Sequence, residues 1–404
     1  MRHRGKSLLY HSFIDYFVIV VVVLSFGTAY LYLYHAGITL LTLLVISVFY
    51  KLSNWSSIKF NIFAIVYLLL IPINIFLYGC DMNMIGNIIF LVSSLLIFSS
   101  FDYDSFRHKY FNIVIFISLI SIFFEVLYIL NIISPVLYGS ESEGLFGHYI
   151  YGYHVFGGGL WGMNNQLYGI FWEPGIYQMV LNLALILNLD LYEKDVRIRF
   201  KTIKLCILII TILMTMSTTG YLVLGVVLLG WLFKKSKISL GYIVLISLAI
   251  IAFLVVIKYS TVISGKFTEE NASYVARSND LFAFLEIINK YPYWGAGVHS
   301  KTYMQIADQL GMTGSQSAGI LFQTAQFGMF WILSFFISLI SEYKKRRISM
   351  GTPFYLLAIL FLGLGEPLVY APLMLIYVLP FKKIKHGKVI NNSNSNIQYG
   401  GVTS

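Results

Sequence analysis

The cationic residues of this chain gather in alternate connections between long apolar runs, and this pattern restricts the possible folds more than any other feature. Of the 28 Lys and Arg residues, 23 lie in such connections or at the chain ends. They occupy residues 2–6, 51–59, 107–109, 194–204, 234–237, 344–347 and 382–388. Loops rich in Lys and Arg stay on the cytoplasmic side of a membrane. The pattern therefore predicts a multi-pass membrane protein with both termini in the cytoplasm.

The apolar runs between these clusters make up most of the chain. Hydrophobic residues are 58% of the 404 residues and charged residues only 11%, a balance that excludes a soluble domain of this length. With about 20 apolar residues for each spanning helix, the sequence predicts an all-α polytopic bundle of about twelve transmembrane helices. The formal charge of +10 is the sum of the cationic loops. Because no basic groove concentrates it, we expect the lipid bilayer as a partner and no nucleic acid.

The order of the runs divides the chain into regions. Residues 1–133 are expected to form helices one to five, at roughly 13–33, 37–50, 58–78, 85–101 and 111–133. A first external loop, 134–165, precedes helices six to nine in 166–258 and a second external loop, 259–317. Helices ten to twelve occupy 318–381, and residues 382–404 form a polar, disordered cytoplasmic tail. Both external loops are expected to contain short amphipathic helices.

Two apolar runs, 205–233 and 353–380, are too long for one upright helix and short for two. Ser217-Thr218-Thr219-Gly220 interrupts the first, and Gly363-Leu364-Gly365-Glu366-Pro367 interrupts the second. Cations flank both ends of both runs, so each run must return to the side on which it began. Both are therefore predicted to be hairpins, whose halves either span the membrane or re-enter it.

The first external loop is rich in glycine and aromatic residues and runs through Asn164 and Asn165 towards Trp172 and Glu173. Aromatic faces stack on sugars, and glycine lets a backbone approach a ligand closely. An aromatic belt at the membrane interface explains the same composition. Glu173 precedes a proline that is well placed to start helix six, so it either caps that helix or is a functional carboxylate at membrane depth.

The second external loop holds the remaining five cations, of which Arg277 is the only arginine. Ser278-Asn279-Asp280 is predicted to cap a helix at about 281–290 that lies along the bilayer surface. Arg277 would then sit at a helix N-terminus and hold an anion, or form a structural salt bridge with a neighbouring acid. Pro292 ends the helix, and the turn Gly295-Ala296-Gly297 leads to His299.

Other polar residues give weaker signals. The histidines lack the spacing of a metal site, so none is predicted. Glu125 in helix five and Glu366 in the last hairpin are intramembrane acids, each either paired within the bundle or part of a site. Cys80 and Cys206 fall at opposite ends of their spans, so no disulfide is expected.

Three stretches together resemble the bacterial O-antigen polymerase and O-antigen ligase superfamily. They are Gly169-Ile170-Phe171-Trp172-Glu173-Pro174-Gly175 entering a span, Ser217-Thr218-Thr219-Gly220-Tyr221, and Arg277 followed by an amphipathic helix and Tyr291-Pro292-Tyr293-Trp294-Gly295-Ala296-Gly297. Order, spacing and topology agree over roughly residues 131–344. The resemblance implies a metal-independent, GT-C-like glycosyltransferase of the bacterial inner membrane that needs no cofactor.

The same resemblance implies a substrate and residue roles. The substrate would be undecaprenyl-diphosphate-linked oligosaccharide, whose repeat units are joined on the periplasmic face into O antigen or capsule. Arg277 would stabilise the leaving diphosphate, and Glu173 or His299 would position or deprotonate the acceptor hydroxyl. The substrate-binding candidates are Asn164, Asn165, Trp172, Lys290, Tyr293, Trp294 and Glu366. Whether a chain-length regulator protein binds is left open.

Two departures from the family pattern bear on the activity. Gly314-Ser315-Gln316-Ser317 stands where ligases usually place a His-Asn pair, which favours a polymerase over a ligase. The first external loop has no arginine, although family members often have one there. The alternative from another class is a transporter or flippase of lipid-linked oligosaccharide, because about twelve spans, broken hairpins and buried acids also mark transporters.

Overall fold

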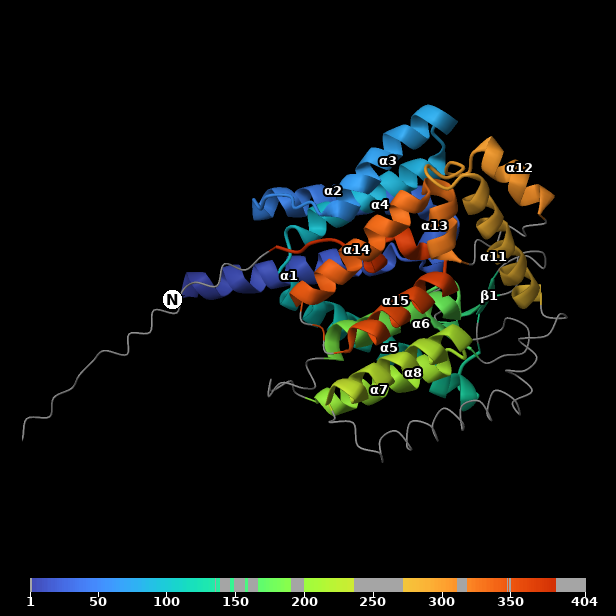
Figure 1. Cartoon of the computed structure of the whole chain (residues 1–404). Helices are drawn as coiled ribbons and strands as arrows, with labels where there is room; N and C mark the ends of the chain where they lie inside the picture. The colour runs from blue at the N-terminus through green and yellow to red at the C-terminus, as the bar shows by residue number, and fades with distance from the viewer. Residues whose placement is uncertain are drawn as a thin grey trace, which may run out of the picture.

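The computed structural model describes residues 2–134, 136–138, 146–148, 157–158, 166–189, 200–235, 272–310, 318–346, 348 and 350–382. For residues 2–11, 29–35, 136–138, 146–148, 157–158, 234–235 and 272–277 it describes the backbone alone. The described chain is a bundle made mainly of helices (Figure 1). The expected ninth helix, Asn164, Asn165, the segment 314–317 and the tail beyond residue 382 lie outside the described residues.

The first five expected helices are present, with one boundary displaced. They are α1 (Arg2–Leu24), α2 (Ala29–Asn54), α3 (Ile62–Tyr78), α4 (Met82–Phe98) and α5 (Tyr103–Ile129). Asn61, Asp81 and Asp102 cap α3, α4 and α5 by accepting a backbone N–H in the first turn. The break between α1 and α2 comes before residue 29 rather than at 33–37, because Gly27 adopts φ +79° in the connection.

The run 205–233 is a helical hairpin, as predicted. It consists of α7 (Lys201–Met214) and α8 (Thr218–Lys235), which pack against each other and against α6 (Pro174–Asn188). The turn is at residues 215–217, where Met216 has φ +51°. Thr218 already lies in α8, so the break comes slightly before the polar segment that indicated it.

The C-terminal region differs from three uninterrupted spans. It comprises α13 (Gly319–Phe327), α14 (Met329–Arg346), α15 (Thr352–Gly365), the 3-10 helix η3 (Leu368–Tyr370) and α16 (Pro372–Leu375). Gly328, at φ +80°, separates α13 from α14. With 14 residues, α15 is about 21 Å long, less than the roughly 30 Å hydrocarbon thickness of a bilayer. After it, residues 366–382 return as buried short turns, so the expected twelfth helix does not form.

The first external loop was expected to contain short amphipathic helices, and the described part contains strands instead. They are β1 (Val136–Tyr138), β2 (Phe146–His148) and β3 (Gly157–Gly158), and a further strand, β4 (Leu167–Gly169), follows just after the expected loop. They form an antiparallel sheet in the order β1-β2-β3-β4, with a bulge at Gly157 and Gly158. Glycine weakens a helix by roughly 1 kcal/mol relative to alanine, so a glycine-rich segment is better suited to extended backbone.

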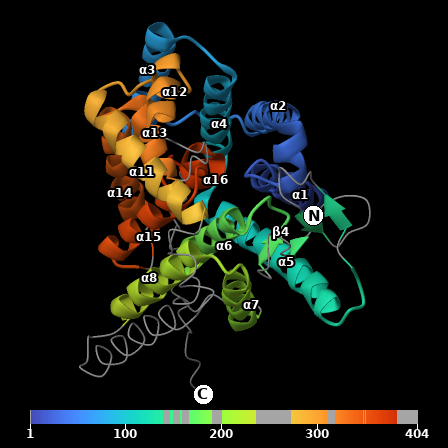
Figure 2. The ribbon, with the colours of Figure 1, turned by 90° about the vertical axis from the view of Figure 1, so that its right-hand side faces the viewer.

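Cationic side chains of different helices bond to groups at one end of the bundle, where α1 and α7 begin and α14 ends, at the left in Figure 1. Several of them donate hydrogen bonds to groups at that end: Lys51 to Ser99, Lys59 to the Phe381 carbonyl, Arg107 to the Leu187 carbonyl, Lys204 to Asn112 and Arg346 to the Ile376 carbonyl. The opposite end carries α11 (Ala272–Lys290) and α12 (Lys301–Gln309), which lie in front of α13 in Figure 2. The cationic connections that the structure describes, at 51–59, 107–109, 201–204 and 344–346, therefore lie at one end.

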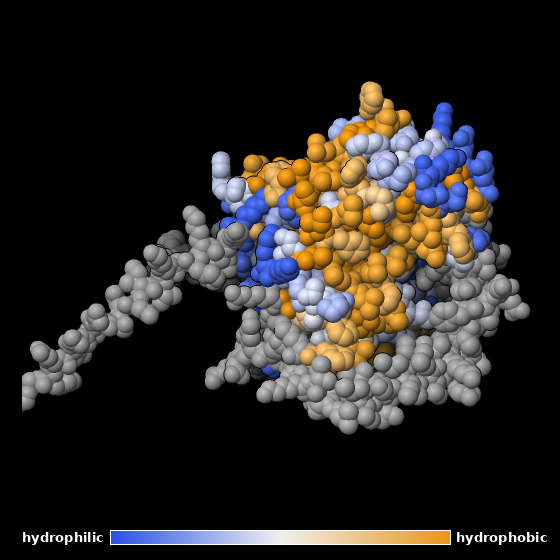
Figure 3. All heavy atoms as spheres, viewed as in Figure 1, coloured by the Kyte–Doolittle hydropathy of each residue, from blue (hydrophilic) through white to orange (hydrophobic). Residues whose placement is uncertain are grey.

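The apolar core of the described residues also holds buried polar side chains, and the surface exposes many large apolar ones. Asn74, Gln178, Asn182 and Ser338 are fully buried, whereas large apolar residues on several helices are exposed. Figure 3 shows hydrophobic residues across the middle of one face, with hydrophilic residues towards its left and upper right. Among the described residues, two helices, Ala36–Asn54 and Tyr103–Ile129, are long and apolar enough to cross a membrane. Shorter apolar helices of 10–17 residues accompany them.

Candidate functional site

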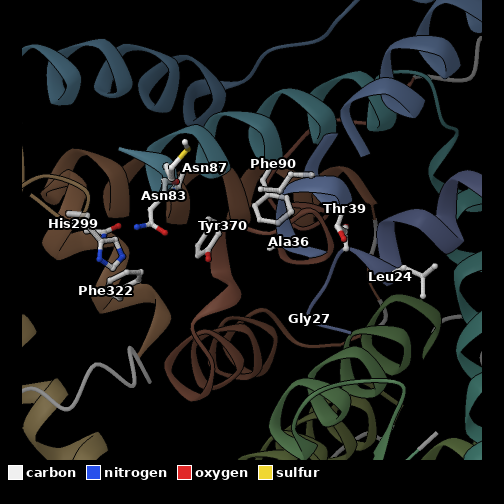
Figure 4. Close-up of a pocket in the computed structure, with 15 residues that line it drawn as sticks. Leu24, Gly27, Ala36, Thr39, Asn83, Asn87, Phe90, His299, Phe322 and Tyr370 are labelled. Atoms are coloured by element: carbon white, nitrogen blue, oxygen red, sulfur yellow. Dashed lines mark hydrogen bonds between the residues drawn. The ribbon is translucent and has the colours of Figure 1, made fainter. Parts of the chain in front are cut away.

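A cavity of about 390 Å³ lies in the half of the bundle away from the cationic end. Its walls come from the α1–α2 connection, the start of α4, α13, His299 and Tyr370 (Figure 4). In that view His299, Asn83 and Phe322 lie at one end of the cavity, Thr39, Gly27 and Leu24 lie at the other, and Tyr370 is between them. Segments far apart in the sequence therefore build one polar, partly aromatic pocket.

The start of α4 supplies two amides to the cavity wall. Asp81 caps α4 by accepting the Met84 N–H at 2.8 Å, which fixes the first turn. Asn83 and Asn87 then lie one turn apart on the same side of the helix. The buried Asn87 accepts the Tyr67 hydroxyl at 2.9 Å and donates to the Asn83 carbonyl at 3.0 Å. Its amide is thus held in a fixed orientation at the pocket.

The segment before His299 is fixed by backbone contacts with α13. The N–H of Ala296 donates to the Ala325 carbonyl at 2.8 Å, and that of Gly297 donates to the Gln326 carbonyl at 3.2 Å. Gly295 and Gly297 have φ of +71° and +89°. A Cβ on Gly295 would lie 2.3 Å from the backbone of Gln326, so this approach requires glycine. The predicted turn into His299 is present and forms part of the pocket.

His299 combines a constrained backbone with a partly buried ring. Its φ is +44°, an uncommon value for a residue other than glycine. The ring lies 5.8 Å, centroid to centroid, from both Tyr303 and Phe322. Burial lowers the pKa of His299 below its usual value, and the charge of Asp81 opposes this shift only in part. At neutral pH the imidazole is therefore uncharged and able to accept a proton.

Glu366 and the start of α6 meet beside the Gly27 end of the pocket. Glu366 is buried, and its carboxylate lies against Gly175 in the first turn of α6. Glu173 is the N-cap residue of α6, with Pro174 at the first helical position as predicted. The backbone N–H of Trp172 donates to the Gly27 carbonyl at 3.2 Å. Three of the predicted site residues, Trp172, Glu173 and Glu366, therefore lie in neighbouring segments.

The remaining sequence candidates lie elsewhere. Lys290, Tyr293 and Trp294 are exposed, and Tyr293 and Trp294 pack on Phe330 with ring centroids 6.3 and 5.3 Å away. Trp294 lines a separate apolar groove between α3 and α14 rather than the polar cavity. The structure does not bring these residues together with His299, because the tight turn at Gly295 directs the chain past α13 between them.

Arg277 does not occupy the predicted helix N-terminus. The helix begins at Ala272, so Arg277 and Ser278-Asn279-Asp280 lie within it, and the side chain of Arg277 is outside the described part. The expected surface helix is also packed: Phe284 and Ile287 are buried against Phe322 and its neighbours. Phe282 and Leu285 remain exposed. Thus α11 has an apolar face on the bundle and a second one turned outward.

Some pocket residues were not identified from the sequence. They are Asn83, Asn87, Gln326 and Tyr370. The available signal was the pair Asn83 and Asn87, four residues apart in an otherwise apolar helix. Gln326 has no such signal, because its burial depends on the segment 295–299 packing against α13.

Within the described ranges, no group of three His, Cys, Asp or Glu side chains is placed to hold a metal ion. Glu125, the other acid expected at membrane depth, is buried in α5. The chemistry available at the pocket is therefore that of an uncharged imidazole, amides, hydroxyls and aromatic rings, with carboxylates nearby. No family model, curated protein or solved structure matches this chain.

Proposed function

We propose that this protein is a polytopic glycosyltransferase of the bacterial inner membrane that polymerises polysaccharide repeat units carried on undecaprenyl diphosphate. The observation that carries the proposal is the pocket: an uncharged His299, the amides of Asn83 and Asn87, and aromatic rings line a cavity of about 390 Å³. Such a combination suits a sugar, because aromatic faces cover its C–H surface and neutral hydrogen-bonding groups bind its hydroxyls.

The placement of the pocket supports an external active site. The cationic clusters gather at the other end of the bundle, and cationic loops remain in the cytoplasm. The exposed apolar side chains between the two ends are suited to lipid contact, and the buried polar side chains to helix association within a membrane. The pocket then opens on the side where lipid-linked saccharides are joined, and both termini are cytoplasmic.

The proposed reaction is a glycosyl transfer with a lipid diphosphate as leaving group. A hydroxyl oxygen of the acceptor repeat attacks the anomeric carbon of the donor chain, and the bond from that carbon to the phosphate oxygen breaks. His299 accepts the hydroxyl proton, because burial keeps its imidazole uncharged. Arg277 on α11 stabilises the negative charge that develops on the departing diphosphate. No nucleotide sugar or metal takes part.

Glu173, Glu366 and Trp172 have supporting roles in this proposal. Their segments meet beside Gly27, at the end of the pocket away from His299. A carboxylate at the first turn of a helix is stabilised by the backbone N–H groups and the helix dipole. We assign to these residues the positioning of the acceptor rather than the proton transfer.

The experiment that tests the proposal is the glycan pattern of a strain lacking this protein. Loss of a polymerase should reduce the ladder of lipopolysaccharide or capsule to a core with a single repeat. Loss of a ligase leaves bare core, and loss of a flippase removes the glycan. A full ladder in the deletion strain, in the absence of a redundant enzyme, rules the polymerase out.

A further inference from the structure

Gln326 is a fully buried amide in the wall of the pocket. Neither its Nε2 nor its Oε1 has a hydrogen-bond partner among the described residues. Leaving a buried polar group unsatisfied is costly, so such groups mark places where something outside the chain completes the hydrogen bonding. Because the amide has a donor and an acceptor side by side, it matches a ligand that offers both.

The charge of the pocket restricts what that ligand is. Among the described residues that line the pocket, none is Lys, Arg, Asp or Glu. Its polar groups are the amides of Asn83, Asn87 and Gln326, hydroxyls and the uncharged imidazole of His299. The carboxylate of Asp81 acts on His299 from nearby and adds negative potential. A diphosphate or a uronate would meet no cation of the described lining, whereas a neutral polyol would meet several hydrogen-bonding groups.

The apolar part of the wall is aromatic. Phe90 and Tyr370 lie with ring centroids 5.6 Å apart and planes tilted by 50°. Phe322 lies beside the His299 ring at the other end, as Figure 4 shows. Aromatic faces can cover the C–H surface of a pyranose while amides bind its hydroxyls. The cavity volume of about 390 Å³ also falls in the range of small-molecule sites.

From these observations we infer that the pocket is the subsite for an uncharged sugar ring of the acceptor, and that Gln326 determines specificity by donating to one ring hydroxyl and accepting from another. Identification of that sugar as the acceptor rests on the proposed function. Binding of a neutral ring does not. The lipid diphosphate binds outside this pocket, and His299 stands where it meets a hydroxyl of the bound ring.

The substitution Gln326→Met tests the inference without damaging the fold. Methionine has a similar length and volume, and it removes an amide that has no partner, so the folded state should keep its stability. Gln323→Met is the control for a buried amide of the same helix that does not line the pocket. Its Nε2 is unpartnered, and its Oε1 accepts the Tyr67 hydroxyl over a long 3.4 Å. After the substitution Tyr67 still bonds to Asn87, at 2.9 Å.

The measurement is saturation-transfer NMR on the purified full chain in detergent. The probes are methyl glycosides of neutral hexoses and N-acetylhexosamines, with methyl glucuronide and inorganic pyrophosphate as competitors. A neutral glycoside should bind the wild type and Gln323→Met alike, and Gln326→Met should weaken it by about tenfold or more. Equal binding to Gln326→Met, no binding of any neutral glycoside, or displacement by pyrophosphate would each overturn the inference.

The result also separates this inference from the proposed function. If a neutral glycoside binds through Gln326 while the deletion strain keeps a full glycan ladder, the sugar site stands and the polymerase proposal fails. If the ladder collapses while Gln326→Met binds every glycoside as the wild type does, the polymerase proposal stands and the role of Gln326 fails.

Discussion

The carboxylate of Glu366 lies directly against the backbone of Gly175, so that a Cβ at residue 175 would be 2.0 Å from Oε1 and 2.7 Å from Cδ of Glu366. Gly175 is in the first turn of α6, and Glu366 follows the last residue of α15. A carboxylate at this end of a helix is stabilised by the helix dipole and by free N–H groups. The contact thus joins the two Glu-Pro junctions of the chain.

Gly175→Ala should displace Glu366 and destabilise the bundle. Forcing a methyl group into a packed contact costs about 1–3 kcal/mol, and the buried carboxylate has little room to move away. Thermal unfolding of the purified protein measures the change. Gly225→Ala is the control, because a Cβ there would meet nothing within 4 Å, and alanine favours a helix over glycine.

The double variant Gly175→Ala/Glu366→Ala identifies the cause. If the clash with the carboxylate is responsible, the melting temperature of the double variant should fall by less than the sum of the falls in the two single variants. Additive losses would show that residue 175 tolerates a side chain poorly for some other reason.

Activity should depend on pH through His299. Its pKa is lowered by burial, so the imidazole is uncharged at neutral pH and gains a proton only below its usual range. Polymerisation should be constant above about pH 6.5 and should fall by about tenfold per unit below the folded pKa. Because the pKa of His299 is lower in the folded state than in the unfolded state, the contribution of this residue to stability is complete above about pH 6.5. That contribution is lost as the pH falls through the folded pKa.

Asp81→Asn offers a matched test of that assignment. Asparagine still caps α4, whereas the charge that raises the pKa of His299 is removed. The acid limb of the pH–rate profile should therefore move to lower pH, with the rate at neutral pH retained. A profile that stays in place, or an active His299→Gln variant, would exclude His299 as the base.

Arg277→Lys should abolish polymerisation while the protein accumulates normally. An ammonium keeps the charge but cannot supply the two parallel N–H groups of a guanidinium, which match a diphosphate. The glycan ladder and the membrane level of the protein measure the two effects. Lys301→Arg, an exposed charge-conserving change at the start of α12, is the control. Wild-type chain length in Arg277→Lys would remove Arg277 from the reaction.

Features of the fold that follow from the positions of the cations could be predicted from the sequence, whereas features that depend on packing between distant segments could not. The α7–α8 hairpin could be predicted because cations at both ends of one apolar run require a return. The break between α1 and α2 could not, because the apolar run is continuous and only Gly27 marks the turn. The return after α15 was predicted by the same argument, but its form as short turns rather than a helix was not, since those turns are buried against neighbouring helices.

The site followed the same division. The turn into His299 was predictable because glycines at 295 and 297 indicate positive φ values. The aromatic side chains that face the pocket could not be predicted. Trp294, for example, lines a separate apolar groove together with Phe330. The helix containing Arg277 begins at Ala272 rather than at the capping pattern of Ser278-Asn279-Asp280, of which Asp280 is fully buried within the helix. Local signals placed the turns, and packing between distant segments placed the side chains.

Arg346 should contribute strongly to the stability of the cationic end of the bundle. Its side chain is 5% exposed, bonds to Glu342, and donates to the carbonyls of Ile376 and Leu379 in the returning segment. Arg346→Ala leaves the Ile376 and Leu379 carbonyls without this donor and Glu342 with Lys345 alone, at a cost of about 1–3 kcal/mol. Lys345 binds the same Glu342 but is 55% exposed, so Lys345→Ala should change stability by less than about 1 kcal/mol. Thermal unfolding of both variants checks the contrast; similar losses would contradict it.

Sidedness can be tested with the two native cysteines. Cys80 is exposed in the connection between α3 and α4, at the pocket end, whereas Cys206 is exposed in α7 near the cationic end. In single-cysteine variants of intact spheroplasts, a membrane-impermeant maleimide should label Cys80 and leave Cys206 unlabelled. Labelling of Lys382→Cys only after permeabilisation gives the internal control, because Lys382 lies at the cationic end.

The same reagent applied to Arg277→Cys in a cysteine-free background tests the proposed reaction geometry. Both Cys80 and α11 belong to the end of the bundle that holds the pocket, so both should be reached from outside. The polymerase reaction needs Arg277 on the side where lipid-linked saccharides are joined. If residue 277 reacts only once the membrane is opened, while Cys80 reacts from outside, the arginine cannot serve this pocket. If both react only after permeabilisation, the orientation is inverted and the polymerase proposal fails with it.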